Sequence, residues 1–253
     1  IARRIEFWSY RACDVVVPVS TALRDLLVER GIDPGKIVVM PNGVNTSQFD
    51  PDDYVDDRSH EHRSSHQSET FTVGFVGALS EWQALPLLFR AVADLRDDGL
   101  DIGVTVVGDG HARREWEEEA DRLGLHDAVR FMGRESHDRV PAYIADFDVG
   151  YSGPVRLGTG NMYMSPLKLY EYLAMATPIV AAAYEDAQRL VTESEAGFLF
   201  EPEDVSDLKR ALRTAYEASD ASLRRRGEEG RDLVLAEHSW KARVQRLKRK
   251  VEE

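Results

Sequence analysis

The sequence has only one cysteine, Cys13, among its 253 residues. An intramolecular disulfide needs two cysteines, so a small disulfide-stapled scaffold is excluded, and the low cysteine content fits a reducing compartment. Apolar runs are also short, and none approaches the roughly 20 residues that span a membrane. No segment has the pattern of a signal peptide. We therefore expect a globular protein of the cytoplasm.

Basic residues are also scarce in comparison with acidic ones. Lysine and arginine number 32 against 45 aspartates and glutamates, which gives a formal net charge of −13. This balance argues against non-specific binding of nucleic acids, whose phosphates attract basic surfaces. Basic residues dominate only in the last predicted helix, which contains Lys241, Arg243, Arg246, Lys248, Arg249 and Lys250. We interpret them as a solvated helix face, with peripheral contact to the anionic inner face of a membrane as the alternative.

What the chain does contain is a regular alternation of strand and helix patterns after residue 70. Short apolar runs typical of buried strands recur, and between them apolar residues return at the spacing of helices. The expected strands are 71–79, 102–108, 129–132, 148–151, 179–182 and 197–200. This alternation predicts an α/β fold with a doubly wound parallel sheet. Ligands of such sheets bind beyond the carboxyl ends of the strands.

Residues 50–70 separate this pattern from the start of the chain. They are polar and have almost nothing to bury, which is typical of a mobile linker at a domain boundary. Three histidines lie among them, His60, His62 and His66. A flexible segment makes a poor metal cage, so we expect no metal ion there.

The residues before the linker have the pattern of the end of another unit. Residues 14–20 and 36–44 are expected to be buried strands on either side of a helix that Ser20 or Thr21 caps. Because the chain opens at Ile1 in a helix-like piece, we expect a fragment whose N-terminal part is missing. Packing roles are expected for Cys13 as a small core residue, and for Trp8, Trp82, Trp240 and His238.

Residues 163–183 are the most informative segment. Lys168 and Glu171 lie three apart, on one face of a predicted helix. Ser165 can cap that helix, and Pro166 suits its first position. A helix N-terminus with free amides, a cation and a carboxylate that can bind hydroxyls together suit the diphosphate of a sugar nucleotide. The alternative is an ordinary helix–strand unit with a surface Lys–Glu pair.

Glycine-bearing turns follow several of the predicted strands. They are Gly77-Ala78-Leu79, Gly108-Asp109-Gly110, Gly133-Arg134-Glu135 and the loop 152–165. Glycine lets a ligand approach the backbone closely and frees amides for phosphate, although such glycines also serve simple turn geometry. Arg156 in the last of these loops, and His111 and His137 near the rim, are further candidates for ligand contact.

These segments, in their order and spacing, resemble the GT-B glycosyltransferases, specifically glycosyltransferase family 4. Residues 14–20 and 36–45 are similar to the family's exit from its first domain. Similarity to its second, donor-binding domain lies in residues 75–80, 106–110, 129–133, 165–182 and 196–202.

The resemblance covers nearly the whole chain and implies a particular architecture. It implies two Rossmann-like domains, of which the chain would hold the end of the first in residues 1–49 and the nucleotide-sugar-binding domain in residues 71–235. A closing helix in residues 236–253 would cross back to the missing first domain.

By the family pattern, Glu171 corresponds to the second of two glutamates spaced eight apart and would bind the ribose hydroxyls of the donor. Tyr163 stands where the first glutamate is usual. Lys168 would contact the diphosphate. The donor-binding segment Ser165, Pro166, Leu167, Lys168 and Leu169 would supply backbone amides, apart from Pro166, which has no N–H and would shape the segment. Backbone around Arg134 and Glu135 would receive the base, and the turns at Gly77, Gly108 and Gly133 would line the site.

Two departures from the family pattern affect the diphosphate. The family often has an arginine at the position of Ala78 and a lysine at that of Gln83, and neither cation is present. Losing two charge-assisted contacts at roughly 1.5–3 kcal/mol each would weaken donor binding. Lys168, Arg156 and the helix amides are the candidates to compensate.

The resemblance implies a retaining transferase that moves a sugar from a nucleoside diphosphate sugar to a hydroxyl acceptor in glycan or glycolipid synthesis. Lys168 and Glu171 would carry the chemistry, no cofactor or metal ion is expected, and the acceptor groups would come from the missing domain. The fragment alone should bind donor weakly and turn over little. Ala78, Gln83 and Tyr163 favour an alternative, a non-catalytic nucleotide-binding or interaction module. A third reading is a sugar-nucleotide epimerase on the same fold.

Overall fold

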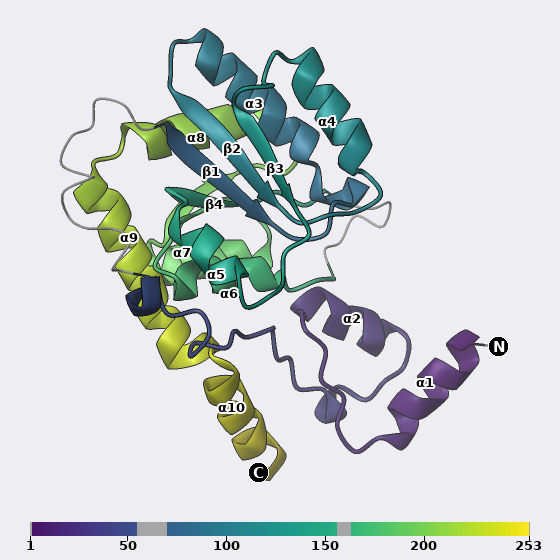
Figure 1. The fold of residues 1–253 in the computed structure, drawn as a ribbon. Coiled ribbons are helices and arrows are strands. Elements are labelled where there is room, and N and C mark those ends of the chain that lie inside the picture. The colour runs from purple at the N-terminus through teal and green to yellow at the C-terminus, as the bar shows by residue number, and fades with distance from the viewer. Residues whose placement is uncertain (1, 55–69, 156–162, 253) are drawn as a thin grey trace.

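The computed structural model describes residues 2–54, 70–155 and 163–252 (Figure 1). The predicted linker falls largely outside the described residues, as do His60, His62, His66 and Arg156, so the expectations for them stay predictions. Among the described residues, none of the helices combines the length and the apolar character that crossing a bilayer requires.

Six parallel strands form one sheet in the order β3-β2-β1-β4-β5-β6. Their bounds are β1 Phe71–Val76, β2 Ile102–Val107, β3 Val129–Gly133, β4 Val149–Ser152, β5 Ile179–Ala182 and β6 Gly197–Phe200. Strand β2 is buried along its whole length, as its largely apolar sequence predicts for a strand covered on both faces. The doubly wound parallel sheet expected from the sequence is confirmed.

Helices cover both faces of this sheet (Figure 1). One face carries α3 (Leu85–Asp97), α4 (Arg113–Arg122) and α8 (Val205–Glu217). The other carries α5 (Val140–Ala145), α6 (Leu167–Ala174), α7 (Glu185–Ser194) and α9 (Asp220–Leu233). The apolar spacing of α3 explains its orientation, because the residues that recur every three or four positions are fully buried: Leu85, Leu88, Phe89, Val92 and Leu95.

The strand order reverses between β1 and β4, which pair directly through the registers Val73–Val149 and Gly74–Gly150. From this pair the chain winds outward in both directions, so the loops that leave β1 and β4 diverge at their carboxyl ends. A crevice at that point is where open α/β sheets bind ligands. The turn at Gly77 and the start of α6 follow these two strands.

Gly150 in β4 allows Tyr172 of α6 to lie directly against the sheet. A Cβ at this position would lie 2.3 Å from Tyr172 Cδ2, and the ring is held because its hydroxyl accepts a hydrogen bond from the Val76 amide at 2.9 Å. We expect Gly150→Ala to lower the free energy of unfolding by about 1–3 kcal/mol, a typical cost of overpacking, in urea denaturation. Gly35→Ala, which would meet only the exposed Asp33 side chain, is the control. Equal losses in both variants would contradict this packing argument.

The first 54 residues form α1 (Ala2–Ala12), α2 (Thr21–Glu29) and two short 3-10 turns. Ser20 caps α2 by accepting a hydrogen bond from the Leu23 amide at 3.2 Å, as predicted. The expected buried strands are wrong: residues 14–20 and 36–44 pair through a single parallel bridge, Val16–Ile37. Within the part of the chain that the structure describes, these two segments have no further strand neighbours, and two strands alone do not make a stable sheet.

The same region corrects the expectation for Cys13, which is exposed rather than buried. Other apolar side chains nearby are also exposed, among them Trp8 at 70%. Among the described residues, no element covers them.

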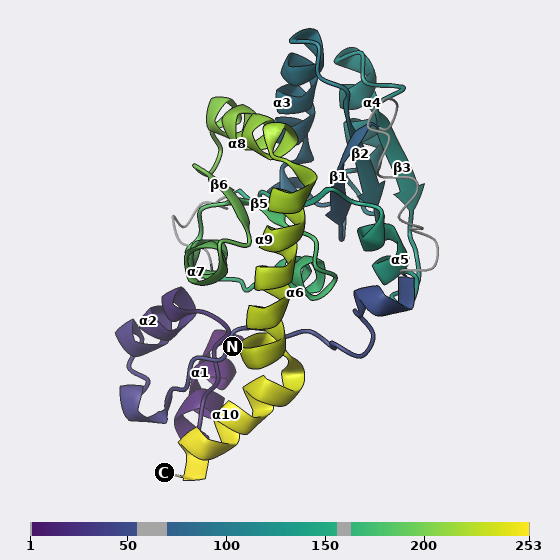
Figure 2. The ribbon, with the colours of Figure 1, turned by 90° about the vertical axis from the view of Figure 1, so that its left-hand side faces the viewer.

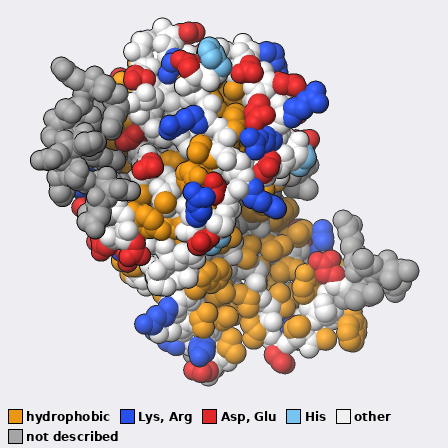
Figure 3. Space-filling view, in the orientation of Figure 1, with side chains coloured by type: hydrophobic (Ala, Val, Ile, Leu, Met, Phe, Trp, Pro, Cys, Tyr) orange, Lys and Arg blue, Asp and Glu red, His pale blue; other side chains and the backbone are white. Residues whose placement is uncertain are grey.

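The last helix, α10 (Trp240–Glu252), runs at the C-terminal end of the chain (Figure 2), and its first residue lies beside Gly43 and Val44. Val44 and Ser239 form a parallel bridge, and the Trp240 amide donates to the Val44 carbonyl at 3.1 Å. Apolar side chains gather over this lower part of the molecule (Figure 3). Exposed apolar residues in and near α2 and α10 are Val17, Val28, Leu235, Trp240, Val244 and Val251.

Candidate functional site

Helix α6 begins at Leu167, with Pro166 in the N-cap position. The prediction that Ser165 caps this helix is wrong, because the Ser165 hydroxyl donates to Asp186 Oδ2 at 2.5 Å instead. The Leu169 amide is engaged with the Pro166 carbonyl at 3.3 Å. The amides of Leu167 and Lys168 are the ones that an α-helix leaves without an intrahelical acceptor. Within the predicted segment Ser165 to Leu169, the amides of Leu167 and Lys168 are therefore the best suited to bind an anion.

Lys168 is buried, with 7% of its surface exposed. Its ammonium group donates to Gln83 Oε1 at 2.8 Å and lies 3.8 Å from the centre of the Phe75 ring. A Cβ at Gly77 would lie 3.2 Å from this nitrogen, so the ammonium sits directly against the turn after β1. Burial lowers the pKa of Lys168 to about 7, against a smaller opposing effect of Glu171. The predicted cation is thus at the point where the strand order reverses.

Glu171 lies one turn further along α6, and 12% of its side chain is exposed. His137, which follows β3, places its Nε2 atom 3.3 Å from Glu171 Oε1. The amide nitrogen of the Gln48 side chain lies 2.9 Å from His137 Nδ1 and donates to the His137 carbonyl, also at 2.9 Å. Burial raises the pKa of Glu171, and the contact with His137 opposes that shift. His137 therefore lies next to the predicted ribose-binding carboxylate.

The glycine turns are packed against one another. A Cβ at Gly108, where φ is +141°, would lie 1.9 Å from the Gly77 carbonyl oxygen. The Gly77 amide donates to the Val107 carbonyl and the Gly108 amide to the Gly133 carbonyl. Glycine at position 108 is thus explained by turn packing, the simpler of the two readings. At Gly77 it additionally gives room to the Lys168 ammonium.

The remaining predicted residues surround these groups. Ala78 and Arg134 are exposed on the rim. Glu135 accepts a hydrogen bond from Tyr143 Oη at 2.7 Å and pairs with Arg139 at 3.2 Å, so its side chain is already engaged. This leaves backbone at positions 134 and 135 as the predicted contact for the base.

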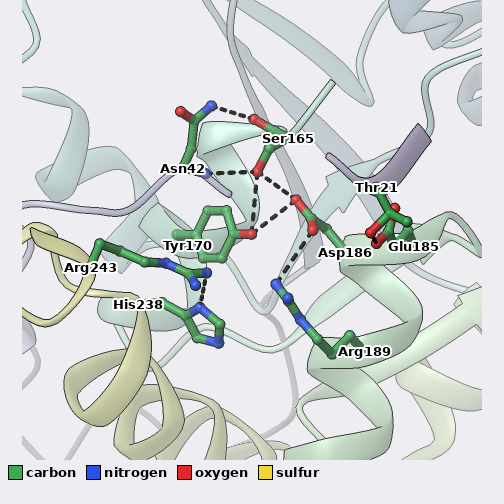
Figure 4. A network of polar contacts seen from close by, with 9 residues as sticks. All are labelled: Thr21, Asn42, Ser165, Tyr170, Glu185, Asp186, Arg189, His238 and Arg243. Carbon is green, nitrogen blue, oxygen red and sulfur yellow. Dashed lines mark hydrogen bonds and ion pairs between the residues drawn. The ribbon is translucent and has the colours of Figure 1, made fainter. Parts of the chain in front are cut away.

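A buried polar network behind α6 was not predicted from the sequence (Figure 4). Asp186, 6% exposed, accepts hydrogen bonds from Ser165 Oγ and from Tyr170 Oη at 2.9 Å, and pairs with Arg189 at 3.4 Å. The Asn42 backbone amide donates to Ser165 Oγ at 3.0 Å, and its side-chain Nδ2 donates to the Ser165 carbonyl at 2.6 Å. The start of α6 is therefore fixed to α7 and to the segment that precedes the linker.

The described residues include one group with the spacing of metal ligands, Glu193, Glu237 and His238. The chemistry does not favour a cation there. Arg243 contacts His238 Nδ1, and the Nε2 atom is buried without a hydrogen-bond partner. Burial, and after it the charges of nearby arginines, lower the pKa of His238 to about 3. A metal ion would meet these positive charges at close range.

Comparison with protein families gives two matches. The model described as Glycosyl transferases group 1 matches residues 70–218, more than half of the chain, and the model described as Glycosyltransferase Family 4 matches residues 1–48.

Individual proteins agree with these matches. The chain is 24% identical over 203 residues to the putative colanic acid biosynthesis glycosyltransferase WcaL of Escherichia coli, covering 80% of this chain and 48% of that protein. It is 29% identical over 247 residues to the D-inositol 3-phosphate glycosyltransferase of Salinispora arenicola, covering 92% and 53%. The chain thus spans about half the length of the curated relatives it matches.

Solved structures of glycosyltransferases have a similar fold. The structure of Anabaena Alr3699/HepE in complex with UDP and glucose superposes with a TM-score of 0.78 at 20% identity, covering 99% of this chain and 66% of that one. At this identity the likeness establishes the architecture of a GT-B glycosyltransferase and nothing finer.

Proposed function

The chain belongs to the family of glycosyl transferases group 1, and on that premise we propose that it is the donor-binding part of an enzyme that transfers a sugar from a nucleoside diphosphate sugar to a hydroxyl acceptor. The observation that carries this proposal is the position of Lys168 and Glu171. Both side chains project from the first turns of α6, at the carboxyl ends of β1 and β4, with the ammonium against the Gly77 turn. The carboxyl ends of the strands at such a reversal of strand order are where open α/β sheets bind nucleotides.

In the proposed reaction, breaking the anomeric bond develops negative charge on the leaving diphosphate. The Leu167 and Lys168 amides at the start of α6, the dipole of that helix and the Lys168 ammonium stabilise this charge in place. Glu171 holds the ribose through its hydroxyls. The scheme needs no metal ion and no cofactor, since the charge is met by groups of the chain.

The alternative of a nucleotide-binding module without transferase activity has specific support. Ala78 offers only a methyl group on the rim, and Gln83 is a neutral amide that is 3% exposed and engaged with Lys168. The pair of cations that is usual at these positions is therefore absent from this chain. Nucleotide binding alone does not separate the two functions, but product formation from a bound donor does.

The acceptor and location of the whole protein are also proposals. The relatives' names, for colanic acid biosynthesis and for D-inositol 3-phosphate, support a hydroxyl acceptor in glycan or glycolipid synthesis. The apolar surface over α2 and α10 (Figure 3) supports packing against a further domain. Exposed basic residues alternate with apolar ones along α10, which supports peripheral contact with an anionic membrane surface: Lys241, Arg246, Lys248, Arg249 and Lys250.

Titration of the chain with UDP, GDP and ADP by calorimetry tests the donor site. We expect heat from one of the three bases, and we expect Glu171→Ala to weaken that binding by about 1–3 kcal/mol because the ribose hydrogen bonds are lost. Glu118→Ala is the control, since Glu118 is an exposed residue of α4 paired with Arg114. Unchanged affinity in Glu171→Ala would remove Glu171 from the site. The absence of binding heat with all three nucleotides would refute donor binding by this chain.

A further inference from the structure

The Lys168 ammonium has an unusual environment for a buried cation. The contacts recorded for it among the described residues are a neutral amide oxygen, that of Gln83, and the face of the Phe75 ring. Glu171, on the same helix, acts on it only through space, and its own carboxylate contacts His137. Burying a charge without a paired carboxylate is costly, and the cost is recovered only when an anion arrives.

Gln83 is held firmly in the position that contacts this ammonium. It ends a short 3-10 turn, Glu81–Gln83, and its backbone amide donates to the Ser80 carbonyl at 2.9 Å. The next residue, Ala84, has a left-handed backbone with φ of +47°, which turns the chain into α3. With 3% of Gln83 exposed, its side chain has little freedom to leave Lys168. The amide oxygen accepts a hydrogen bond but brings no charge.

We propose that Gln83 is a positioning residue that holds the Lys168 amine against the Gly77 turn without neutralising it, so that binding of a donor diphosphate there is coupled to uptake of a proton by Lys168. This inference rests on the proposed function, because it assumes that the diphosphate binds at this turn. The step is a protonation alone: one proton moves from solvent to the amine, and no covalent bond to the donor forms or breaks.

The coupling follows from the difference between the empty and the occupied site. In the empty site, burial favours the neutral amine, which agrees with the pKa of about 7 for Lys168. A bound diphosphate places two negative charges nearby and favours the ammonium, so its pKa rises. At pH 8 most empty sites would therefore be neutral and most occupied sites charged.

The other titratable groups that face Lys168 are few among the described residues. Glu171 lies on α6 itself, and His137 stands behind it after β3. From β1 and the 3-10 turn the facing groups are Phe75 and Gln83, which do not titrate. A His137→Gln variant therefore separates proton uptake at Lys168 from any change at the histidine.

Calorimetry with a nucleoside diphosphate sugar tests the coupling. Both phosphates of such a donor are ionised throughout the range used, so the ligand contributes no protons. Titrations at pH 8 in two buffers with different heats of ionisation give the number of protons bound. We expect uptake of at least half a proton per donor at pH 8, and affinity falling by up to tenfold per pH unit above the pKa of the empty site. His137→Gln should keep this uptake.

Two variants of Gln83 distinguish positioning from mere packing. Gln83→Glu places a carboxylate on the ammonium and keeps it charged in the empty site, so proton uptake should disappear and the affinity should become independent of pH. Gln83→Met removes the acceptor, so uptake should persist while affinity at pH 8 falls further. Gln188→Glu on the exposed side of α7 is the control. Should the Gln83 variants fail to fold, Lys168→Met provides the second measurement, because it should abolish uptake.

The outcomes separate this inference from the function it rests on. Absence of donor binding by the unmodified chain would overturn both. Donor binding without proton uptake, or uptake that survives in Gln83→Glu or Lys168→Met, would overturn the inference and leave the donor site standing.

Discussion

Replacing Asp186 with alanine is expected to lower the free energy of unfolding by about 3 kcal/mol, as measured by urea denaturation. The Asp186 carboxylate is buried and receives hydrogen bonds from Ser165 and Tyr170 in addition to its pairing with Arg189. Removing one member of a buried charged network leaves its partners without compensation, and such losses run to about 3–5 kcal/mol. The lower end applies because 31% of the Arg189 side chain is exposed.

Asp127→Ala serves as the matched control for this prediction. Its carboxylate also pairs with an arginine, Arg96 at 3.4 Å, but 61% of the side chain is exposed. Exposed ion pairs contribute little, so a small change is expected. If Asp186→Ala were as mild as the control, the network would not be what holds the start of α6. Asp186→Asn removes the charge but keeps an acceptor oxygen, so its loss measures the charge, and any further loss in Asp186→Ala measures the hydrogen bonding.

The sheet and most of its helices were predictable because their signals are local. Apolar runs such as Ile102–Val107 are long enough to specify a buried strand, and α3 repeats its apolar residues at helical spacing. Alternation of the two then leaves a parallel sheet as the simplest arrangement. No single segment specifies the order of the strands or the reversal between β1 and β4. That order is consistent with the family resemblance.

Helix α9 shows why other elements were not predicted. Its sequence carries Gly227 and Gly230, which weaken a helix in isolation. In the structure both glycines are buried where α9 meets the end of α6. A Cβ at Gly227 would lie 1.9 Å from the Ala176 carbonyl oxygen. The glycines thus serve close packing between segments that are distant in sequence, and propensity alone does not reveal this.

The candidate site also has a part that the local sequence predicted and a part that it did not. The spacing of Lys168 and Glu171 was enough to place them on one helix, but their partners come from two other parts of the chain, Gln83 and His137, and Gln48 in turn contacts His137. Ser165 had the residue type of a helix cap, yet its hydroxyl is used by Asp186. Such choices depend on which neighbours the fold provides, and a serine before a helix is compatible with either.

Lys168→Met is expected to weaken binding of a nucleoside diphosphate by roughly 30-fold to 150-fold, since one charged hydrogen-bond donor is worth about 2–3 kcal/mol. The bare nucleoside should bind almost as before, because it has no phosphate to lose. Calorimetry with both ligands measures the difference. Lys209→Met is the matched control, as Lys209 pairs with Asp98 on the surface between α8 and α3, away from the crevice. Equal losses for nucleotide and nucleoside would contradict the role assigned to Lys168.

Lys168→Met should also raise the free energy of unfolding of the protein without ligand, although it weakens nucleotide binding. Methionine fills a similar volume without a buried charge. The pKa of Lys168 is about 7 in the folded chain and 10.5 in the unfolded reference. Between these values the unfolded chain binds more protons, so the unmodified protein gains stability as pH rises, whereas below about pH 7 both states are charged and the cost of burial is complete. The advantage of Lys168→Met in urea denaturation should therefore be largest near pH 6 and shrink toward about pH 9. An advantage that is constant with pH would mean that Lys168 keeps its proton in the empty site.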